Sequence, residues 1–440
     1  MMRPVYVALV LAAGSLLAWP SAARAQQRAV PPDTLRLGAL QADAVRRDPR
    51  ARQLDLVAAQ SALRLRSLHT EWLPRADVSG LAQHQSEVAT LPFPGPGGSA
   101  FTLPKDVYDA HLDVRQPIFD PGIGVRREVE QAQLAASQAG VRSTLFTLRQ
   151  SVAHAFFTAL LLAAQSAELR AGVTDLEGQL RVARERVTGG AALPSDTASL
   201  EAEMLRRRQS LAELAANRSA ALAVLGDLTG RRAGEQDTLV LPDLAAEVAG
   251  ARGGFEATRA RPEYEQFART RDVLDRRGAE IGRRDWPRLS AVGRAGFGRP
   301  GLNPLGDEFG GYWLAGVQLE WSPWDWGRAG RERQALAIQE EIVATEEASF
   351  TDGVRRGVVR ELATVDRLQQ ALDADGAIIA LREAVLRETR VRFGEGVVAS
   401  AEFVDRETDV LAARLARATH QVELAQARAR FLTLIGVEVR

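Results

Sequence analysis

The stretch Asp106–Gly122, DVYDAHLDVRQPIFDPG, decides the fold of this chain. Its first half alternates without a break: Tyr108, Ala110, Leu112 and Val114 fall on one face, and Asp109, His111, Asp113 and Arg115 fall on the other. A period of two predicts a β-strand with one apolar and one polar side. The prolines, aspartate and glycine of the second half end that strand, and a long helical pattern begins at once. The same succession returns at Tyr312–Gly327, YWLAGVQLEWSPWDWG, so we expect twice a strand that passes into a long helix.

The composition excludes several classes of function. The chain of 440 residues has 56 basic and 56 acidic side chains, and this zero net charge argues against a nucleic-acid binder, which needs a basic face. It has no cysteine, which removes disulfides, cysteine-based zinc sites, thiol catalysis and a lipid anchor on a cysteine after a signal sequence. The five histidines are scattered without metal-ligand spacing. We therefore expect no metal, no cofactor and no nucleic-acid partner.

The N-terminus has the pattern of a secretory signal in residues 1–25. Arg3 precedes an apolar run from Val5 to Trp19, and Ala23-Arg24-Ala25 stands ahead of Gln26. The alternative is a membrane anchor, but the run is short and ends in small residues, which favours cleavage and export. No later stretch reaches the ~20 apolar residues of a spanning helix. The most apolar one, Ala155–Ala164, is predicted to be a buried helix segment.

The rest of the chain shows one order of elements twice. Residues 26–230 are predicted to form a first repeat, residues 231–260 a linker with short elements, and residues 261–440 a second repeat. The first repeat has a helix near 37–72 with a break at Asp48-Pro49, a strand at 75–88, a loop at 91–104, the strand described above, a helix at 122–188, a break at 187–196 and a returning helix capped by Ser195 or Asp196. The loop Leu91–Pro104, LPFPGPGGSAFTLP, is expected to hold neither helix nor sheet. Pro262 and Pro287 follow Pro49 and Pro74 by the same number of residues, which indicates an internal repeat.

The helical stretches predict coiled-coil packing. A helix over some 66 residues is about 100 Å long at 1.5 Å per residue, so such a rod must pack against others like it. The last helix carries a seam at steps of seven, four and three residues, formed by Val404, Leu411, Leu415, Ala418, Val422, Ala425, Ala429 and Leu432. An ordinary amphipathic helix is the alternative, but the length and the alanines favour a coiled coil.

The strands indicate a membrane. Four strands of about ten residues match the ~9–11 that cross a bilayer with tilt. Only closed barrels satisfy the strand hydrogen bonds in lipid, and four strands cannot enclose a useful pore, so several chains would share one barrel. Four of the seven tryptophans lie between residues 313 and 326, as in an aromatic girdle at a membrane interface. A soluble sandwich with core tryptophans is the alternative.

With these features the chain resembles the TolC-type outer-membrane efflux proteins of Gram-negative bacteria. The resemblance covers nearly the whole mature chain and rests on QPIFDPG (116–122), AFFTALLLAAQSAEL (155–169), VTGGAALPSDTASLEAE (187–203) and RFGEGVVASAEFVDRETDVL (392–411). It implies a mainly α fold with a β-barrel part: a coiled-coil tunnel in the periplasm plus four transmembrane strands per chain, in a homotrimer with one twelve-stranded barrel. It also implies contact with outer-membrane lipid, a periplasmic adaptor (membrane fusion) protein docked on the helical tips, and an inner-membrane pump of RND or ABC type.

The resemblance also implies a periplasmic gate. Its acidic positions fall on Glu402 and Asp405, and the polar pair of the first tip falls on Ser195 and Asp196. The adaptor-docking tips fall on Gly189, Gly190, Leu193, Gly394 and Gly396. Carboxylates repeated around a narrow axis attract cations, although an acid in the first turn of a helix is also an ordinary capping choice. Val397, Val398 and Ala399 stand where relatives have a basic latch residue, and Arg392 is a hypothetical substitute.

The leading interpretation is a passive outer-membrane exit duct for an efflux or type I secretion system. The alternative is a non-channel periplasmic coiled-coil scaffold, which would need no lipid-facing strands. No acid/base pair, nucleophile motif or phosphate-binding loop favours an enzyme. Gly293, Gly296 and Gly298 resemble a dinucleotide fingerprint only superficially, because they lie in a strand and precede Arg299-Pro300 rather than a helix.

Overall fold

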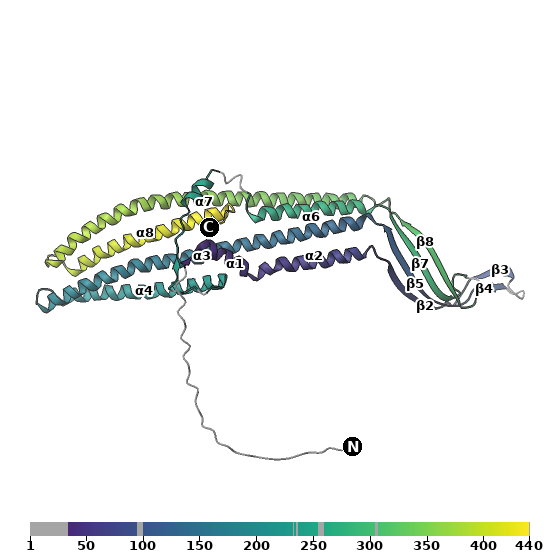
Figure 1. Cartoon of the computed structure of the whole chain (residues 1–440), viewed down its shortest axis with the longest axis horizontal. Coiled ribbons are helices and arrows are strands. Elements are labelled where there is room, and N and C mark those ends of the chain that lie inside the picture. The colour runs from purple at the N-terminus through teal and green to yellow at the C-terminus, as the bar shows by residue number, and fades with distance from the viewer. Residues whose placement is uncertain are drawn as a thin grey trace, which may run out of the picture.

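The computed structural model describes residues 34–94, 100–231, 233–234, 236–253, 259–303 and 307–439, so the predicted signal peptide of residues 1–25 lies outside the described residues. These residues form an elongated body of long helices with a curved antiparallel sheet at one end (Figure 1). The helices are α1 (Leu37–Arg47), η1 (Pro49–Arg52), α2 (Gln53–Thr70), α3 (Pro121–Thr188), α4 (Pro194–Thr229), α5 (Ala245–Ala251), α6 (Pro262–Arg284), α7 (Arg328–Gly394) and α8 (Ser400–Leu434). The strands are β1 (Thr34–Leu35), β2 (Arg75–His84), β3 (Thr90–Pro94), β4 (Ala100–Thr102), β5 (Asp106–Phe119), β6 (Thr238–Leu239), β7 (Arg288–Arg299) and β8 (Gly310–Glu320).

Two rods, α3 and α7, run from the sheet to the far end of the molecule. They have 68 and 67 residues, which confirms the predicted rods and makes each about 100 Å long. Helix α3 starts directly after β5 because Pro121 presets a helical φ and the Asp120 carboxylate accepts a hydrogen bond from the Gly122 N–H at 2.8 Å. At the far end each rod turns back into a shorter partner, so α3/α4 and α7/α8 form two helical hairpins (Figure 1).

The main apolar core lies in the middle of the body, where α1, α3, α4 and α8 meet. Phe156, Phe157, Leu225 and Phe431 are at most 1% exposed there. This confirms that Ala155–Ala164 is a buried helix segment. Among the described helices, α3 alone is long and apolar enough to cross a membrane by length and composition, with a window of mean hydropathy 1.3 that is 44% buried in the chain. The packing of α3 in this core accounts for that apolar character.

The seam predicted on the last helix is buried along most of α8. Leu411, Ala418, Val422, Ala425, Ala429 and Leu432 are each at most 8% exposed, and Val404 and Leu415 are half-buried. Alanine at these positions leaves room for a close approach of neighbouring helices.

The sheet has the order β2-β5-β7-β8, with every neighbouring pair antiparallel. Its register places Val78, Leu112, Ala295 and Trp313 in one row across all four strands. That row belongs to the predicted apolar face, and the face is bare: Val78 is 83% and Trp313 76% exposed. A large exposed apolar face marks a surface that contacts a membrane or another chain.

The opposite face of the sheet carries a polar network. The Tyr312 hydroxyl donates to Asp109 Oδ1 at 2.5 Å, and His111 contacts Asp109 and lies 3.2 Å from Asp113. Arg294 donates two hydrogen bonds to Asp113, at 2.7 and 3.1 Å. The polar side chains therefore satisfy one another on one face of the sheet. Among the described residues, the apolar side chains of the other face are largely exposed, although the rings of Tyr108 and Phe297 lie 6.0 and 5.9 Å from that of Phe309.

The prediction that the loop Leu91–Pro104 holds no sheet is wrong. Within Leu91–Pro104 the structure forms an antiparallel pair, β3 with β4, in which Leu91 pairs with Phe101 and Pro94 with Ala100. The prolines are tolerated because an isolated two-stranded ribbon has two edges, where a missing N–H needs no partner.

Two boundaries also differ from the prediction. β2 ends at His84 rather than Val88, and β5 continues past Pro117 through a register shift to Phe119.

The segment predicted as a linker does contain short elements. β6 pairs in parallel with β1, with Thr34 opposite Thr238, and α5 follows. The break predicted at Asp48-Pro49 is the 3-10 turn η1, and the Asp48 carboxylate caps it by accepting the Arg50 N–H at 2.8 Å.

Candidate functional site at the helical tips

The two hairpins end in the same backbone turn. The Ala191 N–H donates to the Arg186 carbonyl at 2.7 Å in the first tip, and the Val397 N–H donates to the Arg392 carbonyl at 2.9 Å in the second. Gly190 and Gly396 have φ of +74° and +78°, a left-handed conformation that glycine adopts without the steric cost of a side chain. Gly189 and Gly394 stand at the ends of α3 and α7, so the glycines predicted at the tips do form the turns.

The start of α4 differs from the predicted capping. Leu193, 67% exposed, is the capping residue, and Pro194 opens the helix, so Ser195 and Asp196 already lie in the first turn. The helix begins earlier because proline favours the first helical position. Asp196 still serves this terminus, since its Oδ2 accepts the Leu193 N–H at 3.2 Å. The Ser195 side chain is exposed.

Asp196 also links the two tips. Its Oδ1 accepts a hydrogen bond at 3.2 Å from the backbone N–H of Ser400, the first residue of α8. Partial burial would raise the pKa of this carboxyl, but the hydrogen bonds from Ser400 and Leu193 and the charge of Arg186 outweigh it, so the pKa of Asp196 lies below its usual range. One of the four predicted gate residues is therefore committed to holding the tips together.

Arg186 forms a second link that the sequence did not reveal. Its Nη1 donates to the carbonyl of Phe393 in the second hairpin at 2.7 Å, and its guanidinium lies 6.0 Å from the Phe393 ring. Arg392, the hypothetical latch, occupies the matching place in the second tip. Its side chain is exposed and has no hydrogen-bond or ion-pair partner among the described residues. The similarity of the two turns is the signal that would have directed attention to Arg186.

The two remaining gate candidates lie at the start of α8. Glu402 is half-buried and Asp405 is exposed, and they share a side of the helix because they are three residues apart. Glu402 holds the place in the second tip that Asp196 holds in the first, since its N–H bonds to Ala399 as that of Asp196 bonds to Leu193. Neither carboxylate has a side-chain partner in the described part of the chain.

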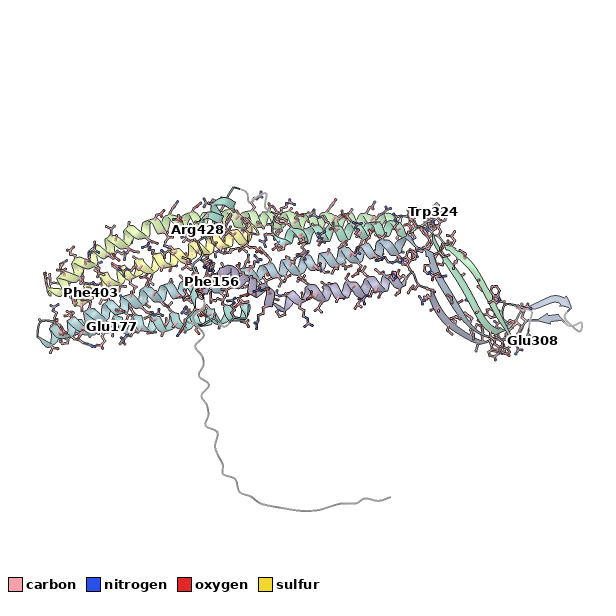
Figure 2. All side chains as sticks on the ribbon, viewed as in Figure 1. Phe156, Glu177, Glu308, Trp324, Phe403 and Arg428 are labelled. Atoms are coloured by element: carbon pink, nitrogen blue, oxygen red, sulfur yellow. The ribbon has the colours of Figure 1, made fainter. Side chains whose placement is uncertain are left out.

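An apolar cluster joins the two hairpins next to their tips. The rings of Phe393 and Phe403 stack with centroids 5.2 Å apart, and Phe403 is fully buried. Figure 2 marks Phe403 near the end of the helical body that lies far from the sheet. Leu176, Leu180 and Leu200 of the first hairpin pack in the same cluster. The tips are thus fixed relative to each other by packing as well as by Asp196 and Arg186.

Deeper in the body, one arginine is buried between the hairpins. The Arg207 side chain of α4 is 2% exposed, and its Nε donates to Glu203 Oε1 at 2.8 Å. Its Nη2 contacts Glu407 of α8 and donates to the Thr408 hydroxyl at 3.3 Å. Gly172 makes room for this guanidinium, because a Cβ there would lie 2.7 Å from Nη1. Burial lowers the pKa of Arg207, but the bonds to Glu407 and Glu203 outweigh it and leave the pKa raised.

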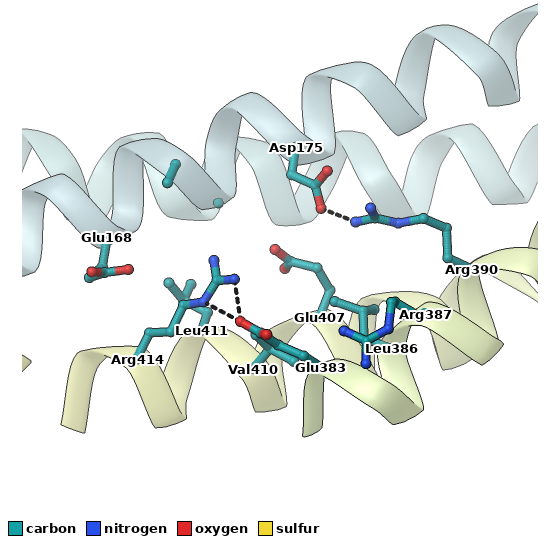
Figure 3. A pocket seen from close by; sticks show the side chains of 12 residues that line it. Glu168, Asp175, Glu383, Leu386, Arg387, Arg390, Glu407, Val410, Leu411 and Arg414 are labelled. Atoms are coloured by element: carbon teal, nitrogen blue, oxygen red, sulfur yellow. Dashed lines mark hydrogen bonds and ion pairs between the residues drawn. The ribbon is translucent and has the colours of Figure 1, made fainter. Parts of the chain in front are cut away.

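Beside this arginine a cavity of about 350 Å³ separates α3 from α7 (Figure 3). Ion pairs cross or line it: Arg390 of α7 with Asp175 of α3, and Arg414 with Glu383 at 2.6 Å. Glu407 faces the cavity from α8 (Figure 3). Three carboxylates of the cavity, those of Asp175, Glu383 and Glu407, belong to ion pairs with arginines. No group of three or more histidine, aspartate or glutamate side chains suited to a metal ion occurs among the described residues.

Comparison with known proteins relates the chain to outer-membrane channels. The family model described as outer membrane efflux protein matches residues 40–231, while no curated protein matches the chain. Among solved structures, the channel protein CusC has a TM-score of 0.69 at 14% identity, over 91% of this chain and 92% of that one. VceC of Vibrio cholerae has 0.66 at 13%, over 92% and 97%, and the MtrE outer membrane channel of Neisseria gonorrhoeae has 0.64 at 17%, over 92% and 89%. These structural similarities establish the fold.

Proposed function

We propose that this chain, whose residues 40–231 match the family model described as outer membrane efflux protein, is the passive exit duct of a tripartite efflux or type I secretion system. The protein lies in the outer membrane with its helical part in the periplasm. The observation that carries the proposal is a sheet whose apolar face is bare, joined directly to rods about 100 Å long. Such rods reach well beyond a bilayer of ~30 Å hydrocarbon thickness.

The open edges of the sheet support the proposal of a trimer with one shared barrel. Within the described part of the chain, β2 and β8 each have a neighbouring strand on one side only. An open edge is not tolerated in lipid, because each unpaired N–H and C=O would lack a partner. Three copies of the four strands, joined edge to edge, make a twelve-stranded barrel with the polar network toward the lumen. Each chain supplies two strand pairs, one from each of two repeats, residues 26–230 and 261–440, and residues 231–260 connect the repeats.

The periplasmic gate is placed at the helical tips. Glu402 and Asp405 have uncommitted carboxylates at the end of the molecule, and three copies of them around an axis would attract cations. Ser195 and Asp196 line the neighbouring tip, with Asp196 serving as a link rather than as a free charge. The turn residues Gly189, Gly190, Leu193, Gly394 and Gly396 are the docking points for a periplasmic adaptor, behind which an inner-membrane pump of RND or ABC type supplies the cargo.

Single-channel conductance of the purified protein in planar bilayers tests the duct and the gate together. The variant is Glu402→Ala/Asp405→Ala, and Glu185→Ala, which removes an exposed carboxylate from the last turn of α3, is the matched control. We expect small, cation-preferring openings that lose part of their cation preference and grow in the variant but not in the control. Unchanged openings would leave the duct and reject the gate, and silence from all three proteins would reject the duct.

The scaffold alternative fits the structure less well. A periplasmic coiled-coil scaffold has no use for a sheet with Val78, Trp313, Val317 and Leu319 all more than 60% exposed on one face. Monomeric protein that binds no membrane would be its signature.

A further inference from the structure

The junction between the second strand pair and its helices carries an unusual concentration of two residue types. We name residues 283–288 and 321–333 the arginine–tryptophan collar; Trp324 marks its position in Figure 2. It contains Arg283, Arg284, Arg288, Arg328, Arg331 and Arg333 together with Trp286, Trp321, Trp324 and Trp326. Its only acids are Asp285, Asp325 and Glu332, so the collar is basic although the chain as a whole has no net charge.

The two segments of the collar meet in space, and two of its three acids are already occupied. Glu332 of α7 accepts Arg284 from the end of α6 at 2.7 Å and Arg328 at 2.8 Å, which fixes the two helix ends against each other. Asp325 accepts the backbone N–H groups of Gly327 at 2.8 Å and Ala329 at 2.6 Å.

Three guanidinium groups of the collar have no carboxylate within ion-pair distance among the described residues. Arg283 stacks on the Trp286 ring at 4.3 Å, Arg331 donates to the Trp326 carbonyl at 3.1 Å, and Arg333 donates to the Ala329 carbonyl at 3.4 Å. All three side chains are exposed, and each keeps N–H donors for another acceptor.

The collar begins where the apolar face of the sheet ends. Leu319 is 63% exposed at the end of β8, and Trp321, Trp324 and Trp326, which follow it, are 58%, 74% and 81% exposed. Tryptophan at this depth is typical of the membrane–water interface. The arginines therefore lie at the level of the lipid headgroups, on the side of the bilayer that faces the helices.

The equivalent junction of the first strand pair is different, so the collar is more than a general property of strand ends. That junction has one tryptophan, Trp72, and its Arg126 pairs with Glu71 and lies 3.5 Å from Asp120. Its acids therefore neutralise Arg126, and Arg127 is left there as an exposed arginine without a carboxylate partner among the described residues, against three such arginines in the collar.

We propose that the arginine–tryptophan collar binds the headgroups of anionic phospholipids in the periplasmic leaflet. Guanidinium groups recognise phosphate through paired charge-assisted hydrogen bonds, and basic side chains beside a membrane surface favour anionic lipid. Arg283, Arg331 and Arg333 supply the donors, and the exposed indoles pack beside the glycerol region. The inference rests on the membrane placement given under the proposed function.

Lipid retention by the full-length protein tests the proposal. The protein is taken into nanodiscs of phosphatidylglycerol and phosphatidylcholine in equal parts, extracted with mild detergent, and its retained lipid is counted by native mass spectrometry. We expect wild type to retain phosphatidylglycerol over phosphatidylcholine by about tenfold or more. Arg283→Gln/Arg331→Gln/Arg333→Gln should lose this preference. The control Arg66→Gln/Arg170→Gln/Arg181→Gln, which removes three exposed arginines from the helical body, should keep it.

Several outcomes would overturn the proposal: equal retention of both lipids by wild type, equal loss in the collar and control variants, or displacement of the lipid by millimolar inorganic phosphate. Should the triple variant fail to fold, Arg283→Gln alone should still lower the preference, and Arg283→Lys should restore part of it. Conductance, measured in parallel, separates this result from the proposed function. A collar variant that conducts normally but lacks the preference supports both, whereas a wild type that does not conduct rejects the duct alone.

Discussion

The two helical tips have the same backbone turn, yet their side chains serve different purposes. In the first tip, Arg186 and Asp196 reach across to Phe393 and Ser400 of the second hairpin. In the second tip, the residues in the matching places, Arg392 and Glu402, make no such contact within the described chain. The charged side chains of the first tip therefore bind the second hairpin, whereas those in the matching places of the second tip form no bond to the first hairpin among the described residues.

This difference shows how a repeated backbone acquires two functions. The turn itself needs only glycine at one left-handed position in each copy, so the side chains around it are free to diverge. The first tip attaches the two hairpins to each other, and we propose that the second tip carries the acidic residues of the gate. Three substitution pairs that compare one tip with the other, and a fourth that compares a buried with an exposed arginine of the first hairpin, would break or sharpen this contrast.

The largest effect is expected for Arg207→Ala, which removes the buried cation that the first hairpin inserts against the second. Glu203 and Glu407, 8% and 5% exposed, would be left without their shared partner, and breaking a buried pair costs about 3–5 kcal/mol. The guanidinium chloride midpoint in detergent measures this. The neighbouring Arg208→Ala, which removes an exposed pair with Glu177, should cost less than about 1 kcal/mol. Equal losses would show that the burial of Arg207 contributes nothing.

Arg186→Ala should be the next largest change. It deprives the Phe393 carbonyl of a charged donor, and a hydrogen bond to a charged group contributes about 1.5–3 kcal/mol. The same substitution in the second tip, Arg392→Ala, should change stability by no more than about 0.5 kcal/mol because the side chain is exposed. Wider single-channel openings in the first variant alone would assign the link between the tips to Arg186, and the reverse result would restore Arg392 as the latch.

Gly190→Ala and Gly396→Ala test the turns themselves. Both place a side chain at a positive φ, which costs about 1–2 kcal/mol. The new Cβ meets nothing within 4 Å at Gly190 but lies 2.9 Å from Arg186 Nη2 at Gly396, so the second substitution should also disturb the link. In the background of Arg186→Ala the two thermal shifts should become equal. A difference that persists there would mean that the clash is elsewhere.

The smallest effect is expected for Asp196→Asn, and it depends on pH. Because the pKa of Asp196 is lowered in the folded protein, the carboxylate stabilises the fold above its unfolded pKa of about 3.9, and that contribution disappears as the pH falls through the lower folded value. The stability difference between wild type and variant, about 1 kcal/mol, should thus be constant above about pH 5 and vanish in strong acid. Glu402→Gln is the counterpart in the second tip, and an equal pH-dependent loss there would remove the contrast between the tips.

The helices, strands and turns could be predicted from the sequence, but the contacts between them could not. Alternation at 108–114, proline and glycine at the breaks, and the seam on α8 depend on neighbours along the chain, so the strands, rods and turns could be predicted. The contacts of Arg186 and Arg207 with the second hairpin could not, because Phe393 and Thr408 lie some 200 residues away from them and one more arginine on a helix rich in arginine carries no local signal. The β3–β4 pair could not be predicted either, because the prolines of this segment argue locally against any sheet.

The tip residues were located correctly as turn positions, but their roles needed three-dimensional information. Asp196 and Glu402 look alike in sequence, as acids in the third position of a helix. Only the placement of Ser400 beside Asp196 distinguishes a committed carboxylate from a free one.

The register of β5 with β7 has a consequence for how the chain is made. Tyr108 pairs with Arg299, so the central pair of the sheet joins two strands that are far apart in the sequence. Contacts of such long range form slowly, because the intervening chain must first be ordered. The α3/α4 hairpin lies wholly between these strands and is complete before β7 is synthesised. During that interval β5 exposes apolar side chains and an unpaired edge, both of which promote aggregation. We therefore expect the secreted chain to be most prone to aggregation after β5 has emerged and before β7 arrives to pair with it.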